Sequence, residues 1–133
     1  MSMVWPVPAG MPRVALVTGG AARLGRAIAL ELARAGFDVA LHYNTSAQAA
    51  EQTAAEIHAL GRRAVLLPAD LAQEAMVTPL MAEATRKLGP VGVLVNNASV
   101  FMRDEWDSVT RAGWDAHMEP NTRAPFVHIA VKN

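Results

Sequence analysis

The sequence predicts an α/β fold in which helices cover both faces of a parallel sheet. Four short apolar runs lack alternating polar positions, which is typical of strands that are buried on both faces. Helical segments with apolar residues every three or four positions separate these runs. The predicted strands are Val14–Val17, Val39–Leu41, Ala64–Leu67 and Val91–Val95.

Glycines end the first two predicted helices. Gly36 suits the C′ position of the first helix, and Gly61 stops the second. The second helix should begin near Thr45 or Ser46, because Thr45-Ser46-Ala47-Gln48 has the form of a capping box. The predicted buried faces are Leu24, Ala27, Ile28, Leu32 and Ala35 in the first helix, and Ala47, Ala50, Ala54 and Ile57 in the second.

Prolines limit the later helices. Pro79 would clash with an established helical turn, whereas a proline at the first helical position is well tolerated. We therefore expect a loose turn over Gln73–Val77, followed by a helix from Pro79 to Leu88 with Thr78 as its N-cap and Gly89-Pro90 as its end. A last helical segment should begin at Thr110 and be interrupted or bent at Pro120 and Pro125.

Right-handed crossovers make this order of elements a Rossmann-like, doubly wound parallel sheet with strand order 3-2-1-4. A ligand would lie across the carboxyl ends of strands one and four. The sheet is expected to be incomplete, with later strands absent, so that the fourth strand is an exposed edge.

The composition indicates one globular domain. The chain has 133 residues, of which 52% are hydrophobic and 18% charged, enough for a sizeable core. The 12 basic and 12 acidic residues cancel, which argues against a nucleic-acid partner. The absence of cysteine excludes disulfides and thiolate chemistry, and a cytoplasmic location is expected. No apolar stretch approaches the ~20 residues of a membrane span. We expect residues 1–12 to form a loose leader and residues 13–133 to form the domain.

The glycine-rich turn after the first strand has the layout of a phosphate-binding βα unit. Its glycines allow positive φ and close backbone approach, and the following helix offers unpaired N–H groups to an anion. A plain tight turn is the alternative. The candidate residues here are Gly19, Ala22, Arg23, Leu24 and Gly25.

Four motifs in sequence order resemble the N-terminal half of the short-chain dehydrogenase/reductase superfamily. They are Thr18-Gly-x-x-x-Arg23-x-Gly25, Asp70-Leu71, Asn96-Asn97-Ala98 and Asn121-x-x-Ala124-Pro125. The superfamily usually has glycine where Arg23 and Ser99 stand. Both departures resemble the pteridine reductase-like branch, which implies an NADPH-dependent oxidoreductase that reduces a pterin-like small molecule when complete.

The end of the second strand favours NADPH over NADH. A carboxylate there would bind the ribose 2′-hydroxyl of NAD, yet the segment contains no acid, while several of its side chains and Arg23 can donate to a phosphate. Thr45 and Ser46 could instead only cap the helix, with Arg23 solvated. The candidates in this segment are His42, Tyr43, Asn44, Thr45 and Ser46.

The resemblance also assigns residues to the adenine and the substrate. It implies that Asp70 meets the adenine amino group with Leu71 against the ring, although Asp70 could simply cap the next helix. Asn97, Ala98 and Ser99 would reach the ribose and nicotinamide. In the pteridine reductase-like branch the matches of Ser99 and Phe101 contact substrate, but Phe101 could equally be a core or interface residue.

One expected catalytic residue is present, because Asn121 matches the active-site asparagine of the superfamily. The preceding Pro120 could enhance the helix kink there or misplace Asn121. The usual Tyr-x-x-x-Lys pair is absent from the 133 residues, whose single tyrosine is Tyr43. We therefore expect the chain to be inactive alone. The four histidines are scattered and give no metal signature.

Three hypotheses remain from the sequence. The first is the pteridine reductase-like enzyme, the second a general carbonyl or 3-oxoacyl thioester reductase, and the third a non-catalytic nucleotide-binding module or inactive fragment. Because the helix after the fourth strand commonly forms a dimer interface in this superfamily, a homo-oligomer is expected.

Overall fold

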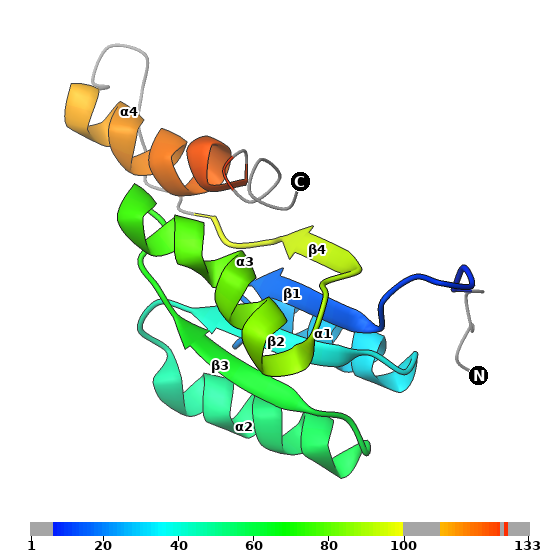
Figure 1. The fold of residues 1–133 in the computed structure, drawn as a ribbon. Helices are drawn as coiled ribbons and strands as arrows, with labels where there is room; N and C mark the ends of the chain where they lie inside the picture. Colours follow the sequence, from blue (N-terminus) through cyan, green and yellow to red (C-terminus); the bar gives the residue numbers. More distant parts are fainter. Residues whose placement is uncertain (1–6, 100–109, 126, 128–133) are drawn as a thin grey trace.

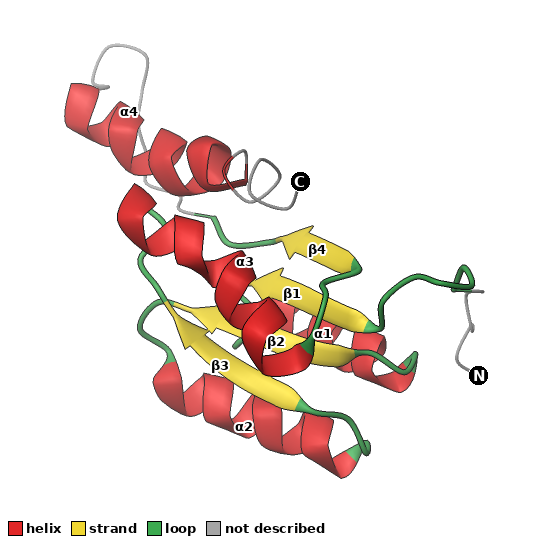
Figure 2. Ribbon diagram, in the orientation of Figure 1, coloured by secondary structure: helices red, strands yellow, loops and turns green. Residues whose placement is uncertain are grey.

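The computed structural model describes residues 7–99, 110–125 and 127. Its four parallel strands form one sheet in the order β3-β2-β1-β4, which confirms the predicted fold class and strand order. Their arrowheads all point toward the end of the molecule where α4 lies (Figure 2). The strands are β1 (Val14–Thr18), β2 (Asp38–Tyr43), β3 (Ala64–Pro68) and β4 (Val93–Asn96).

The helices form a layer on each face of the sheet. Figure 1 shows α3 on the near face, and α1 and α2 pack on the opposite one. Within the described ranges, none of the helices has the length and apolar content needed to cross a bilayer. The helical segments are α1 (Arg23–Arg34), α2 (Ala47–Ala59), α3 (Glu74–Leu88), α4 (Arg111–Met118) and the π-helical turn η1 (Glu119–Arg123).

The core is divided by the sheet into two clusters. Leu16 of β1 packs with α3 residues such as Val77 on one face, while the next residue, Val17, packs with Ile57 of α2 on the other. All five residues of β1 are buried because this strand lies between two others and beneath helices on both faces. The continuous apolar runs were therefore the correct signal for a two-sided sheet.

The predicted buried face of α1 is correct only in part: Leu32 packs against the core and Ile28 is half-buried, but the other three residues are exposed. Leu24 is 65% exposed, and Ala27 and Ala35 are also exposed. The buried positions begin at Gly25, which lies so close to the glycine turn that a Cβ atom there would be 1.9 Å from the Gly19 carbonyl oxygen. This contact rotates α1 so that positions following Gly25 at four-residue spacing face the sheet. The buried residues of α1 are Gly25, Ala29, Leu30 and Ala33.

The other helices begin where predicted except α3, since Ser46 is the N-cap of α2 and Thr110 the N-cap of α4. Ala50, Ala54 and Ile57 are buried in α2 as expected, whereas Ala47 is exposed. The helix α3 begins at Glu74 rather than at Pro79, which lies inside it. The burial of Val77 in the core stabilises the extra first turn, and the Thr78 hydroxyl donates to the Glu74 carbonyl at 3.3 Å. Glycines at positions 36, 61 and 89 follow α1, α2 and α3 with positive φ, as the helix-end predictions require.

Candidate functional site: the carboxyl edge of the sheet

The backbone of the glycine turn is held by hydrogen bonds to residues outside the turn. Gly19 has a φ of +62°, and its N–H donates to Nδ1 of His42 at 3.0 Å. The N–H of Gly20 donates to the backbone carbonyl of the same histidine, also at 3.0 Å. Both bonds join the turn to the end of β2 through His42.

The helix that follows the turn has an uncapped N-terminus. Its N-cap residue, Ala22, offers no side-chain acceptor, so the first N–H groups of α1 point past the turn with their partial positive charge. Arg23 stands there exposed, with a φ of +53° that is unusual for a residue with a side chain. An uncapped helix N-terminus beside an exposed guanidinium favours an anionic ligand.

Thr18 joins the turn to the end of β4. Its side-chain oxygen Oγ1 accepts hydrogen bonds from the N–H groups of Asn97 and Ala98, each at 3.0 Å. The Asn97 amide Nδ2 donates to the carbonyl of Gly19 at 3.2 Å. Sequence reasoning read Thr18 as part of the motif but gave it no role. The signal was a hydroxyl directly after a buried strand, at a sheet edge where a second strand also ends.

His42, like Thr18, is a buried polar residue of this edge, with 2% of its surface exposed. Its Nε2 donates to the carbonyl of Ala69 at 2.8 Å, while Nδ1 accepts from Gly19, so the hydrogen bonds define the neutral tautomer with the proton on Nε2. Burial lowers the pKa of His42, although the bond to the Ala69 carbonyl acts in the opposite direction. The ring therefore joins the glycine turn to the segment after β3.

Asp70 follows Ala69, and its carboxylate is engaged locally. Oδ1 accepts from the Ala72 N–H at 3.0 Å, and Oδ2 accepts from the Gln73 side-chain amide at 3.3 Å. Asp70 therefore does not cap α3, whose N-cap is Gln73; its carboxylate closes a turn just before the helix. A carboxylate has further lone pairs, so the oxygens of Asp70 can also accept from an adenine amino group, as the resemblance implies.

The end of β2 lacks the predicted capping bond. Ser46 is the N-cap of α2, but its side chain makes no capping hydrogen bond. Asn44, Thr45 and Ser46 are all exposed, and the chain from 42 to 46 contains no acid. These side chains remain as donors at a second uncapped helix N-terminus, which again suits a phosphate.

A cavity of about 350 Å³ unites several of the predicted residues. It lies between the carboxyl edge of the sheet and the α4–η1 segment, which contributes Ala116 and Pro120, neither of them predicted as a site residue. Gly19, Arg23 and Asn97 lie outside its lining. The predicted site residues that line it are His42, Asn44, Asp70, Leu71, Ala98 and Ser99.

Asn121 is in η1, next to the buried Pro120. The helix does widen there into a π-helical turn, as the kink prediction requires, but Asn121 is exposed and does not line the cavity. Its catalytic role stays a prediction. Phe101, the predicted substrate contact, lies outside the described residues.

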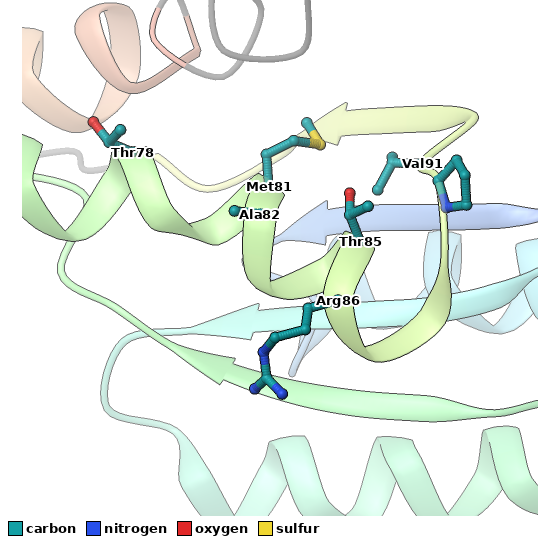
Figure 3. A pocket seen from close by; sticks show the side chains of 7 residues that line it. Thr78, Met81, Ala82, Thr85, Arg86 and Val91 are labelled. Atoms are coloured by element: carbon teal, nitrogen blue, oxygen red, sulfur yellow. The ribbon is translucent and has the colours of Figure 1, made fainter.

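A larger hollow of about 710 Å³ lies away from these residues, on α3 and the segment before β4 (Figure 3). Most of its lining is aliphatic or hydroxyl-bearing, and its one charged side chain, Arg86, pairs with Glu83 of the same helix at 2.8 Å. The one lining group that could bind a phosphate, Arg86, is already paired with Glu83, so the smaller cavity at the carboxyl edge is the better candidate for the site.

The fold and this edge define an α/β protein of the doubly wound class, in which ligands bind at the carboxyl ends of the strands. The profile of the short chain dehydrogenase family matches residues 13–131, and the chain belongs to that family.

Similar proteins agree with this assignment. The short-chain dehydrogenase/reductase eriH of Hericium erinaceus is 40% identical over 86% of this chain and 46% of its own length. The structure of FolM alternative dihydrofolate reductase 1 from Brucella canis, complexed with NADP, aligns with a TM-score of 0.85 at 38% identity, over 90% of this chain and 48% of that one. A blue fluorescent protein from a metagenomic library, in complex with NADPH, aligns with a TM-score of 0.87 at 41% identity, over 90% and 49%. The chain thus spans about half the length of each.

Proposed function

We propose that this chain forms the cofactor-binding half of an NADPH-dependent oxidoreductase, which in complete form reduces a pterin-like small molecule. The observation that carries the proposal is the meeting, at one edge of the sheet, of two uncapped helix N-termini, Arg23 and an acid-free end of β2. A ligand with both a diphosphate and a separate phosphate suits these features.

The residues present fit NADP. The N–H groups at the start of α1 would hold the pyrophosphate, and Arg23 with Asn44, Thr45 and Ser46 would hold the 2′-phosphate. Asp70 and Leu71 would take the adenine, and the 97–99 segment the ribose and nicotinamide. The close approach of Gly25 to the turn leaves no room for a side chain there, which keeps the backbone accessible to a large anion. When bound, the cofactor supplies hydride.

The substrate class is inferred from Ser99 and Phe101. Ser99 is exposed and lines the cavity, where its hydroxyl can bond a polar ring edge, and an aromatic ring at 101 could stack on a flat heterocycle. The similarity to the FolM dihydrofolate reductase supports this choice. Turnover of a 3-oxoacyl thioester, but not of a dihydropterin, by the complete protein would favour the general carbonyl reductase instead.

Asn121 would orient water near the reacting groups. Because the 133 residues lack the Tyr-x-x-x-Lys pair, we expect them to bind cofactor without turnover. We also propose a cytoplasmic location, a homo-oligomeric assembly through the α4 side of the molecule, and no nucleic-acid or membrane partner.

The test compares NADPH and NADH affinity in the wild type and in Arg23→Ala. Alanine keeps the positive φ of this position, so the variant removes the charge without relieving the backbone. Loss of a charge-assisted bond to phosphate should weaken NADPH binding by roughly ten- to a hundredfold and leave NADH unchanged.

Arg34→Ala is the matched control. It removes an exposed arginine from the last turn of the same helix and should change neither affinity. Equal losses of NADPH and NADH affinity in Arg23→Ala would contradict the phosphate role, and no binding of either cofactor by the wild type would contradict the proposed function itself.

A further inference from the structure

His42 makes three hydrogen bonds to backbone groups of neighbouring segments. Its ring accepts from Gly19 and donates to Ala69, and its backbone carbonyl accepts from Gly20. The backbone N–H of Ala69 also donates to the carbonyl of Tyr43, so a side-chain bond and a backbone bond both join the end of β2 to Ala69, just after β3. One buried side chain therefore connects the turn proposed for the pyrophosphate with the segment proposed for the adenine.

We propose that His42 is a positioning residue for the cofactor and that only its neutral form holds the glycine turn in the binding geometry. The inference rests on the proposed function, because it concerns the affinity of that same cofactor site.

The chemistry of the ring gives the reason. Nδ1 can accept from the Gly19 N–H only while it carries no proton, since a protonated Nδ1 would place two donors against each other. The Nε2 bond to Ala69 survives protonation, so the change acts on the turn alone. Because the ring is buried, water cannot replace the lost acceptor without a shift of the turn.

Cofactor and proton should therefore compete. By linkage, a cofactor that requires the intact turn must also hold His42 neutral, so binding lowers the pKa of this ring further. Burial already lowers the pKa of His42 in the free chain, so the transition lies below the ordinary pKa of a histidine.

Other charged groups surround this region and must be separated from His42. Asp70 lines the same cavity, Arg23 stands at the turn, and Glu74 of α3 pairs with Arg123 of η1 at 3.7 Å. His117 lies in α4. The residues of β1 and β4 are uncharged. A variant of His42 keeps all of these groups, so the difference between its pH profile and that of the wild type belongs to His42.

The experiment measures NADPH affinity from about pH 7.5 to about pH 5 for the wild type, His42→Gln, His42→Asn and His58→Gln. Both His42 variants lack the titrating ring. The 2′-phosphate of NADPH also titrates near pH 6, but it contributes equally to the measurements on all four proteins. We expect the affinity of the wild type to fall about tenfold more over this range than that of the His42 variants, which start weaker and vary less with pH. The exposed His58, in the last turn of α2, is the control, and its variant should follow the wild type.

A second measurement uses only the wild-type protein, so it does not depend on whether the His42 variants fold. Ring ¹⁵N chemical shifts of the wild type should report the Nε2–H tautomer at neutral pH, and adding NADPH should move the His42 titration to lower pH. Parallel pH profiles for wild type and His42 variants, or a titration that NADPH leaves unchanged, would overturn the inference alone. Failure of the wild type to bind NADPH at any pH would overturn the proposed function as well.

Discussion

The Thr18 hydroxyl offers a direct test of how the site is assembled. Thr18 is 1% exposed, and its Oγ1 is the acceptor for both Asn97 and Ala98. In Thr18→Val a methyl group of similar size replaces the hydroxyl, so packing in β1 is kept while two backbone N–H groups lose their partner. Each unsatisfied buried N–H costs about 1–3 kcal/mol. Because these two are only partly buried, we expect a total loss of about 3 kcal/mol, which lowers the melting temperature of a domain this size by roughly 10 °C.

Urea unfolding followed by circular dichroism measures this loss, and Thr18→Ser provides the control. Serine keeps the acceptor and removes only a methyl group, so it should cost about 1 kcal/mol. If Thr18→Val stays within about 0.5 kcal/mol of the wild type, the hydroxyl does not hold the end of β4 and the explanation of the site is wrong. In the expected case Thr18→Val also weakens NADPH binding, because the 97–98 segment is released.

Three further predictions concern the same half of the molecule. Gly25→Ala should abolish cofactor binding and destabilise the fold by about 3 kcal/mol, because the added Cβ would meet the Gly19 carbonyl. A variant that is stable in thermal unfolding and still binds cofactor would contradict this close packing. Arg23→Gly should stabilise the chain by about 0.5–1 kcal/mol in urea unfolding by relieving the positive φ, and a destabilised variant would show that Arg23 makes contacts that outweigh the strain. Burial would raise the pKa of Asp38, but hydrogen bonds from Arg63 and the nearby arginine charges outweigh it and hold that pKa below its usual value. The resulting stabilisation is complete above about pH 4 and is lost as the pH falls through the lowered value. Asp38→Asn should therefore cost about 2 kcal/mol at neutral pH and flatten the acid end of the stability profile, whereas an acid-unfolding curve identical to that of the wild type would refute the ion-pair explanation.

The strands, their order and the ends of three helices could be predicted because each depends on local signals. Apolar runs without polar alternation specify strands buried on both faces, and glycine at C′ ends a helix. The rotation of α1 could not be predicted in this way. It depends on the contact between Gly25 and the Gly19 carbonyl, a tertiary approach in which the important residue has no side chain and so adds nothing to an apolar pattern.

The site shows the same division. Motif positions led to most of the cavity lining, including Asn44, Asp70 and Ser99. The bonds that hold those segments together were not predictable, because His42 and Thr18 act across strands that meet only in the folded sheet. The resemblance brought Asn121 to the site, but no signal in the sequence showed that its neighbour Pro120 and Ala116 of α4 would line the cavity.

The central position of β1 has a consequence for the order in which the chain folds. The bond between Gly19 and His42 joins residues 23 apart, whereas the bond between Thr18 and Asn97 spans 79 residues. Closing the longer loop costs about 1 kcal/mol more in chain entropy, and β4 is also the last of the described strands to emerge during synthesis. The β1–β2–β3 part of the sheet can thus form before β4 is available. A nascent chain would carry a partly shaped glycine turn until β4 pairs with β1. If the turn binds the proposed cofactor, cofactor present at that moment would stabilise the final pairing step.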